Sequence, residues 1–246
     1  MDSDMTRDLI FAIIFMIYPG ILIFIAKQFE KSGWGKDTTR KFVHAAMGLV
    51  ILFIPFFTYK FMALIPPIIF VFINALDYRF GLLSQIQGED KGNIGTVLYP
   101  ISYVILISVF FHTAFWGLAV LGILSMAFGD ASASLIGRAF GRHKYSVNDE
   151  PRSYEGSAAM FFFTFVLTAI ILGVYGRQMG LAPGFFTLFP ASLLIASVST
   201  AVEALSFKGS DNLMVPVLTA LAAWILINQF VPNVLGNQTI VNQPLF

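Results

Sequence analysis

Acidic and basic side chains recur at helical spacing in the segment Gly129–Lys144. Asp130, Ser134, Arg138 and Arg142 stand four positions apart, so a helix through this segment would carry them on one stripe. Guanidinium groups bind phosphate oxygens in pairs, and a carboxylate among cations is a usual ligand for Mg²⁺ beside nucleotide phosphates. The spacing therefore predicts a site for a polyphosphate and Mg²⁺, to which Lys144 would add a point charge.

Small residues form a second stripe next to the first. Gly129, Ala133, Gly137 and Gly141 are also four positions apart. Their missing side chains would admit either a phosphate group or the backbone of a neighbouring helix. Both interpretations stay open for these glycines.

A further candidate phosphate site lies in the sequence RSYEGS at 152–157, directly before an apolar stretch. The free N–H groups at a helix start attract anions, and Gly156 and Ser157 would supply close approach and a hydroxyl. Arg152 would contribute a guanidinium. Glu155 is either a catalytic carboxylate or an acidic residue that merely stabilises the helix start.

Two more groups of polar residues border apolar stretches. Glu203 lies in an apolar helix end, and Asp211 and Asn212 stand where the next helix begins. A carboxylate in such surroundings needs a cation or a proton, so Glu203 is a candidate catalytic and metal-binding residue. Asp211 is either a second metal ligand or a helix cap, and Asn212 is a candidate nucleotide-binding residue. Arg40 and His44 share a helix face, where Arg40 is a candidate nucleotide-binding residue and His44 is either catalytic or simply packed.

The elements that carry these residues are membrane helices. Of the 246 residues, 57% are hydrophobic and 12% are charged, against about 25% charged in soluble domains. Stretches of roughly 20 apolar residues span a membrane. Eight such stretches occur, at Leu9–Ala26, Phe42–Thr58, Phe61–Leu76, Ile94–Phe111, Thr113–Phe128, Ser157–Tyr175, Gly184–Ala201 and Asn212–Val231. We therefore predict an all-α polytopic bundle of about eight spans, within a range of seven to nine, as a single membrane domain over residues 1–246.

The distribution of lysine and arginine predicts the orientation of these spans. Cytoplasmic loops of membrane proteins are enriched in both. With the N-terminus outside, twelve face the cytoplasm: Lys27, Lys31, Lys36, Arg40, Lys41, Arg79, Lys91, Arg138, Arg142, Lys144, Arg152 and Lys208. The other face holds three, Arg7, Lys60 and Arg177. The candidate site thus faces the cytoplasm, and residues 129–156 form its nucleotide-binding loop.

Several other functions do not fit this pattern. The net charge of +1 gives no indication of a nucleic-acid partner. A transporter would need ionisable groups near the middle of its spans, and here they collect at one face. P-loop, Rossmann, HExxH and GxSxG motifs are missing from the sequence. Acidic residues with Arg and Lys at a lipid boundary instead suit Mg²⁺-assisted phosphoryl or nucleotidyl transfer to a lipid.

Four blocks of the sequence resemble the CTP-dependent lipid-alcohol kinases, a family comprising dolichol kinase, phytol kinase and the CTP-type diacylglycerol kinase. In order, they are RKFVH from Arg40, GTVLYPIS from Gly95, GDASASLIGRAFGRHK with RSYEGS from Gly129, and EALSFKGSDNLMVP from Glu203. The last two blocks are the specific ones. Arg152 and Tyr154 depart from the Lys and Leu that the resemblance leads us to expect.

The resemblance implies transfer of the γ-phosphate of CTP, with Mg²⁺, to the hydroxyl of a membrane lipid alcohol. Asp130 and Glu203 would hold Mg²⁺ or orient the hydroxyl, and Arg138, Arg142 and Lys144 would bind the triphosphate together with Arg152. We expect an isoprenoid alcohol such as a polyprenol, dolichol, geranylgeraniol or phytol. Diacylglycerol phosphorylation and CDP-lipid synthesis remain alternatives, and the oligomeric state stays open.

The substrate chain and the location complete the expectations. Phenylalanines in two spans could line a groove for a branched chain or simply face lipid: Phe161, Phe162, Phe163, Phe165, Phe185, Phe186 and Phe189. We expect a multi-pass protein of a prokaryotic cell membrane, in contact with membrane lipids.

Overall fold

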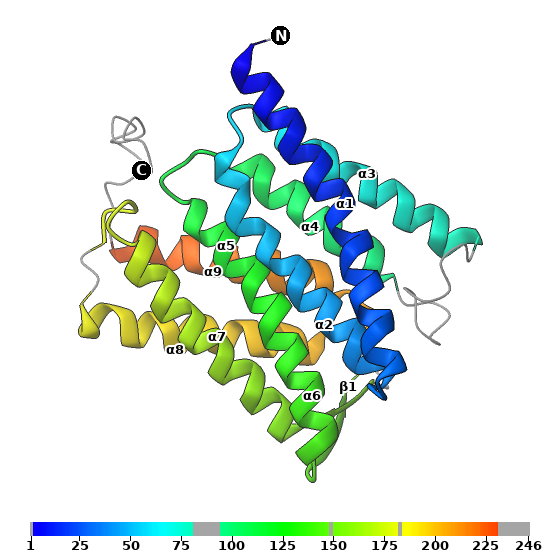
Figure 1. Cartoon of the computed structure of the whole chain (residues 1–246). Coiled ribbons are helices and arrows are strands. Elements are labelled where there is room, and N and C mark those ends of the chain that lie inside the picture. Colours follow the sequence, from blue (N-terminus) through cyan, green and yellow to red (C-terminus); the bar gives the residue numbers. More distant parts are fainter. Residues whose placement is uncertain (1, 81–93, 148–149, 182–183, 231–246) are drawn as a thin grey trace.

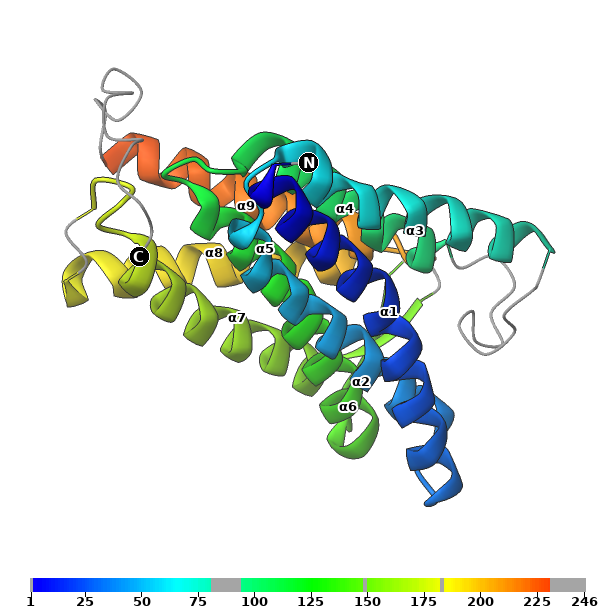
Figure 2. The ribbon, with the colours of Figure 1, turned by 45° about the horizontal axis from the view of Figure 1, so that its top comes forward.

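A computed structural model describes residues 2–80, 94–147, 150–181 and 184–230. Within them the chain is a bundle of long helices with one short β-hairpin (Figures 1 and 2). The elements are α1 (Ser3–Lys31), α2 (Lys36–Gly48), the 3₁₀ segment η1 (Leu49–Phe56), α3 (Lys60–Phe80), α4 (Gly95–Phe110), α5 (Trp116–Leu124), the π-helical turn η2 (Ser125–Asp130), α6 (Ala131–Phe140), β1 (Lys144–Val147), β2 (Glu150–Ser153), α7 (Tyr154–Tyr175), α8 (Phe185–Leu205) and α9 (Asp211–Phe230).

The predicted spans correspond to these helices. Seven helical segments of the described chain are long and apolar enough to cross a membrane, and α4, with 16 residues, is a shorter apolar helix. The predicted spans at 42–58 and 61–76 are two separate helical segments, α2 with η1 and then α3, despite the prolines within them. The protein is an all-α polytopic membrane protein.

The most deeply buried helix runs through α5, η2 and α6. All nine residues of α5 are buried, including Gly117 and Gly122. A Cβ atom at Gly122 would lie 2.3 Å from the carbonyl oxygen of Pro216, so only glycine lets α9 approach this closely. The π-helical turn η2 then leads directly to Asp130. Such turns insert an extra residue into a helix and are frequent at functional sites.

The first and third helices are joined at the end of the bundle where α1 begins. The buried carboxylate of Asp8 accepts hydrogen bonds from the backbone N–H groups of Thr58 and Tyr59, at 2.9 and 2.7 Å, just before α3 starts. From this junction α1 and α3 diverge toward the opposite end (Figures 1 and 2). Along its length α3 packs on α4, while α1 packs on α2.

Residues 129–156, which the sequence assigns to a loop, are largely ordered secondary structure. The helix continues to Phe140, and β1 and β2 then form an antiparallel hairpin that pairs Lys144 with Ser153. Ser153 caps α7 by accepting a hydrogen bond from the N–H of Gly156 at 3.1 Å. Asn148 and Asp149 lie outside the described residues.

Candidate active site

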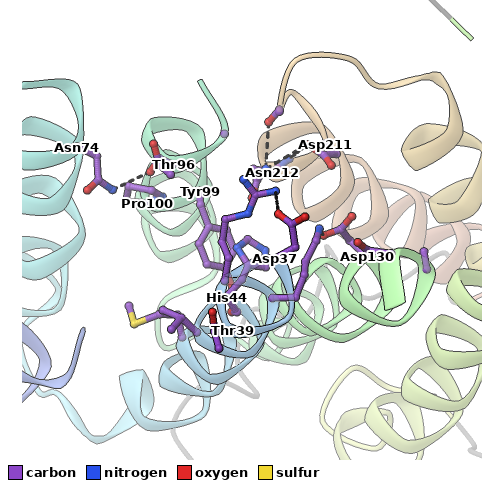
Figure 3. A pocket seen from close by; sticks show the side chains of 18 of the residues that line it. Asp37, Thr39, His44, Asn74, Thr96, Tyr99, Pro100, Asp130, Asp211 and Asn212 are labelled. Atoms are coloured by element: carbon purple, nitrogen blue, oxygen red, sulfur yellow. Dashed lines mark hydrogen bonds and ion pairs between the residues drawn. The ribbon is translucent and has the colours of Figure 1, made fainter. Parts of the chain in front are cut away.

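A cavity of about 1060 Å³ lies between the helices at the end where α2, α4, α7 and α9 begin. A volume at the top of the usual range of about 300–1,000 Å³ can hold more than one small ligand. Figure 3 shows Asp37, Asp130 and Asp211 on one side of it, Asn74, Thr96 and Pro100 on the other, and His44 and Tyr99 between them. We call this end of the molecule the charged end.

Charged side chains line the cavity at the charged end. Among the described residues the basic ones are Lys27, Lys36, Arg40, Lys41, Arg138, Lys144, Arg152 and Lys208. The acidic ones are Glu30, Asp37, Asp130, Glu150, Glu203 and Asp211. Eight cations against six carboxylates leave an excess of positive charge, which favours an anionic ligand.

Asp130 forms an ion pair with Lys41 of α2, and both side chains are largely shielded from solvent, with exposures of 8% and 16%. In the sequence, Lys41 stands out only as one of the cations of a predicted loop. Helical spacing could have identified it, because Lys41 precedes His44 by three positions and therefore shares its face of α2. The pair places a compensated carboxylate at the wall of the cavity.

A second buried ion pair joins the hairpin to α8. Arg152 of β2 contacts the carboxylate of Glu203, whose side chain is 4% exposed, and also donates to the carbonyl oxygen of Ser206 at 2.9 Å. The Nε of Arg152 has no hydrogen-bond partner in the described chain. One guanidinium thus holds a buried carboxylate, and its own Nε is buried without a partner in the described chain.

A third group stands at the rim of the cavity. Arg138 of α6 and Arg40 of α2 both pair with Asp37, at 2.7 and 3.8 Å. The arginine side chains are 49% and 37% exposed, so both guanidiniums are accessible to a ligand. Exposed pairs of this kind are weak, and a phosphate can replace the carboxylate.

Asp211 is partly exposed, and it differs from the buried carboxylates of Asp130 and Glu203 because no cation pairs with it in the described chain. Its Oδ1 accepts from the backbone N–H of Asn212 at 3.0 Å and from the Asn212 side chain at 3.1 Å. The side chain of Asn212 also donates to the carbonyl oxygen of Gly209 at 3.2 Å. Asp211 is therefore a carboxylate with free acceptor capacity at the start of α9.

The carboxylates are suited to Mg²⁺ only together with a nucleotide. No cluster of three or more histidine, aspartate or glutamate side chains in the described residues could hold a metal ion. Mg²⁺ ordinarily binds one or two carboxylates and takes its remaining oxygens from phosphates and water. Asp211, with Asp130 on the same cavity wall, fits that donor set.

His44 lies deeper in the cavity. Its ring stacks on that of Tyr99 of α4 at a centroid distance of 4.1 Å, and its Nε2 has no hydrogen-bond partner in the described chain. The hydroxyl of Tyr99 donates to the carbonyl oxygen of His44 at 3.4 Å, and that of Tyr103 donates to Met47 at 2.8 Å. Both hydroxyls donate to backbone carbonyl oxygens near the end of α2. At this point the chain changes from α-helical to 3₁₀ hydrogen bonding in η1.

The structure separates the predicted site residues into two sets. Along the cavity lie Asp130, Glu203, His44, Arg138, Lys144, Arg152, Gly137, Gly156, Ser157, Arg40, Asn212 and Asp211. Gly141, Arg142 and Glu155 are not part of its lining. Arg142 falls off the predicted stripe because α6 ends at Phe140. Glu155 accepts from the Nδ1 and the backbone N–H of His143, at 2.7 and 3.2 Å, and so ties the start of α7 to the turn before β1.

The glycines serve helix packing in large part. A Cβ atom at Gly129 would lie 2.4 Å from the sulfur of Met160 on α7, and one at Gly156 would lie 2.8 Å from the carbonyl oxygen of Ala133. At Gly141 it would lie 2.1 Å from the carbonyl oxygen of Gly137. Packing against α7 thus accounts for Gly129 and Gly156, whereas Gly137 and Gly141 lie close to Ser153 at the end of β2, where a Cβ atom would come within 2.9 and 2.7 Å of its hydroxyl oxygen.

Away from the charged end the cavity continues as an apolar arm between α1, η1 and α3. The wall on α1 is Phe15, Met16, Pro19, Gly20 and Ile23. The facing walls are Met47, Val50 and Ile54 on α2 and η1, and Pro66, Pro67, Phe70 and Ile73 on α3. One cavity thus joins a charged region to a hydrocarbon-like one.

Asn74 and Thr96 mark the border between the two regions. Pro100 has no N–H, so the carbonyl oxygen of Thr96 lacks its partner within α4. The side-chain amide of Asn74 on α3 donates to that oxygen at 2.7 Å (Figure 3). Neither residue stood out in the sequence, because the link becomes visible only when α3 packs on α4.

Comparison with known proteins identifies related chains. The phytol kinase of the cyanobacterium Synechocystis is 32% identical over 190 residues, which cover 76% of this chain and 78% of that protein. Phytol kinase 1 of Arabidopsis thaliana is 28% identical over 203 residues, covering 77% and 66%. A probable phytol kinase of rice is 30% identical over 214 residues, covering 78% and 65%.

No family model matches the chain, and no solved structure matches it. The identity and mutual coverage with the cyanobacterial phytol kinase nevertheless exceed what unrelated chains share. The chain belongs to the phytol kinase family of membrane-bound lipid-alcohol kinases, which are phosphotransferases with an alcohol group as acceptor.

Proposed function

We propose that this protein transfers the γ-phosphate of CTP to the hydroxyl of a membrane isoprenoid alcohol of the phytol type, giving a lipid monophosphate and CDP. The observation that carries the proposal is the continuity of the cavity, in which a wall rich in arginine and lysine passes into an apolar arm. An amphiphilic alcohol and a nucleotide triphosphate are the two ligands that such a cavity suits. The use of CTP rests on the sequence resemblance.

The triphosphate binds at the charged end. Arg138 and Arg40 exchange their contact with Asp37 for phosphate oxygens, because a guanidinium fork binds two such oxygens at once. Arg152 contributes its unpartnered Nε, and Lys144 adds charge from the hairpin. These groups stabilise the negative charge that spreads over the transferred phosphoryl group.

The alcohol approaches from the apolar arm. Its hydroxyl oxygen attacks the γ-phosphorus while the bond from that phosphorus to the bridging oxygen of the β-phosphate breaks. Asp130 orients the hydroxyl and accepts its proton, and Lys41 compensates the carboxylate until the proton arrives. His44 lies along the same wall, and a small shift of its ring would let the buried, unpartnered Nε2 position the hydroxyl.

Two carboxylates of the cavity wall are the groups that would hold Mg²⁺. Asp211, together with Asp130, would hold the ion against the phosphate oxygens. When bound, the ion neutralises charge on the β- and γ-phosphates. Glu203 is already engaged by Arg152 and contributes mainly by fixing that guanidinium in place.

The charged end is assigned to the cytoplasm by the excess of lysine and arginine in its loops. CTP is a cytoplasmic metabolite, so in this orientation the nucleotide site opens toward the compartment that contains CTP. A location in a prokaryotic cell membrane is part of the same proposal.

The decisive experiment is product analysis with purified protein, Mg²⁺, CTP and phytol in detergent micelles. Formation of phytyl monophosphate and CDP in equal amounts would support the proposal. CDP-phytol with pyrophosphate would replace it with nucleotidyl transfer. Parallel reactions with ATP, GTP and UTP test the choice of donor, and diacylglycerol tests the choice of acceptor.

A further inference from the structure

We propose that the apolar arm binds the hydrocarbon chain of the alcohol and that the chain enters sideways from the membrane, between α1 and α3. The inference rests on the proposed function, because it assigns a place to the acceptor substrate. The seven phenylalanines of α7 and α8 that the sequence suggested as a groove are all described, and none of them lines the cavity. Phe162, Phe185 and Phe186 are instead 60–91% exposed on the outer surface of the bundle.

The arm has the length of a short isoprenoid chain. His44, Met47, Val50 and Ile54 line it at steps of three and four residues, so they follow one face of α2 and η1. At about 1.5 Å per residue in the α-helix and about 2.0 Å in the 3₁₀ segment, this face is roughly 18 Å long. A carbon–carbon bond is about 1.5 Å long, and in an extended zigzag chain each bond adds somewhat less than this to the end-to-end length. The arm therefore holds roughly fourteen main-chain carbons. Three to four isoprene units fit.

The far end of the arm is closed by aromatic rings. Phe15 of α1 lines the arm, and the ring of the buried Phe57 lies behind it at a centroid distance of 5.5 Å. Phe11 packs on the other side of Phe57 at 5.7 Å. A chain longer than the arm therefore cannot continue along α2 and η1, and its remainder has to leave sideways.

The side of the arm that faces the membrane is open. Gly20 lines the cavity and is exposed, and a Cβ atom added there would meet no atom within 4 Å. Ile73 on α3 also lines the cavity and is 37% exposed. Helices α1 and α3 diverge here, since their junction at Asp8 lies at the opposite end. The opening gives a membrane alcohol a route that avoids water.

The wall on α1 changes from apolar to charged at the level where the hydroxyl must stop. Met16, Gly20 and Ile23 are followed on the same face by Lys27 and Glu30, at steps of four and three residues. A hydrocarbon chain gains by contact with the first three residues, a hydroxyl can hydrogen-bond to either of the last two, and a phosphate is attracted by Lys27. The same face therefore sets how deeply the alcohol enters.

The test uses two glycines that both face open space. Gly20→Phe adds a ring at a position that lines the arm and where a Cβ atom meets no atom within 4 Å, and Gly173→Phe on α7 is the matched control, because Gly173 is also exposed with no atom within 4 Å but does not line the cavity. The kinetic constants are measured with geraniol, farnesol, geranylgeraniol and phytol. In the unmodified protein, kcat/KM should rise with chain length from geraniol through farnesol to geranylgeraniol and should be similar for geranylgeraniol and phytol, whose main chains are equally long.

The expected result is a change in chain-length selectivity. Gly20→Phe should raise the KM for geranylgeraniol and phytol roughly tenfold, because the ring displaces several methylenes from contact, and should leave the KM for geraniol and CTP unchanged. Gly173→Phe should match the unmodified protein. An equal loss for every alcohol, or the same effect from both variants, would overturn the proposed chain site. A wild-type protein that phosphorylates none of the alcohols would contradict the proposed function instead.

Photolabelling tests the site independently of turnover. A diazirine-bearing geranylgeraniol in micelles should label peptides of α1 and α3 that include residues 16–23 and 66–73, and excess phytol should suppress the labelling. Gly20→Phe should reduce it, and Gly173→Phe should not. Labelling confined to α7 and α8 would overturn the proposal even if the enzyme is active.

Discussion

Lys41 and Asp130 stand 89 positions apart in the chain and form an ion pair at the wall of the cavity. Asp130→Asn keeps the shape of the side chain and removes the charge that orients the hydroxyl and attracts Mg²⁺. We expect kcat to fall roughly a hundredfold or more, as when an electrostatic group is removed from a transfer site. The rate of lipid phosphate formation at saturating Mg²⁺ measures it, and near-normal turnover would show that Asp130 has another role.

The two arginines that the sequence treated alike should behave differently. Arg138→Lys should raise the KM for CTP roughly tenfold, because a single ammonium charge replaces a guanidinium that can bind two phosphate oxygens at the rim of the cavity. Arg142→Lys should leave it nearly unchanged, since Arg142 lies beyond the end of α6 and off the cavity lining. Steady-state kinetics with CTP as the varied substrate distinguishes them. Equal effects would mean that both arginines contact the nucleotide.

The Arg152–Glu203 pair should combine a structural and a functional role. Arg152→Met leaves a buried carboxylate without its cation, which should cost about 3 kcal/mol of unfolding free energy. The double variant Arg152→Met/Glu203→Gln should recover most of that stability, yet remain poorly active because the phosphate loses its guanidinium. Denaturant unfolding in detergent and the kinase assay provide the two measurements. Full activity in the double variant would remove Arg152 from the phosphate site.

The bond from Asn74 to Thr96 offers a test by compensation. Asn74→Leu leaves the carbonyl oxygen of Thr96 without a partner and should cost about 1–3 kcal/mol. Adding Pro100→Ala returns an N–H to α4 that can donate to the same oxygen, so the double variant should regain stability. Thermal unfolding of the two single variants and the double variant measures the coupling. A double variant no more stable than Asn74→Leu would contradict the explanation.

The orientation can be tested by labelling single cysteines, because the native chain has none. Ser146→Cys in the hairpin is exposed and should react with an impermeant maleimide only from the cytoplasmic side. Gln178→Cys, in the turn after α7, is also exposed and should react only from the other side. The opposite pattern would place the cavity outside the cell.

The sequence predicted the apolar segments well, because a membrane helix is specified by local composition. It also indicated Asp130, Glu203 and Arg152 as candidate site residues, because charged groups at helix ends in a membrane are costly and a purely structural role rarely explains them. Their partners were harder to identify. Lys41 was one of several loop cations, and only the packing of α2 against the helix through η2 brings it to Asp130.

Other features had no local signal. The π-helical turn η2 depends on how α5 and α9 pack, so its insertion before Asp130 could not be inferred from spacing. Arg142 does not lie on the predicted stripe because α6 ends at Phe140, two residues before the position that the four-residue spacing requires. The aromatic groove was inferred from phenylalanine content alone, and phenylalanine serves equally well as a lipid-facing residue.

Asp8 fixes the point where α1 and the start of α3 are held together. Its bonds to Thr58 and Tyr59 fix the apex of the angle between α1 and α3, so the spread of the two helices at the membrane opening is governed at the end farthest from the reacting phosphate. Small changes around this apex would be magnified along the length of α1 before they reach Gly20. Selection could therefore retune which lipids are admitted through residues near Asp8, while every group that handles the nucleotide stays as it is.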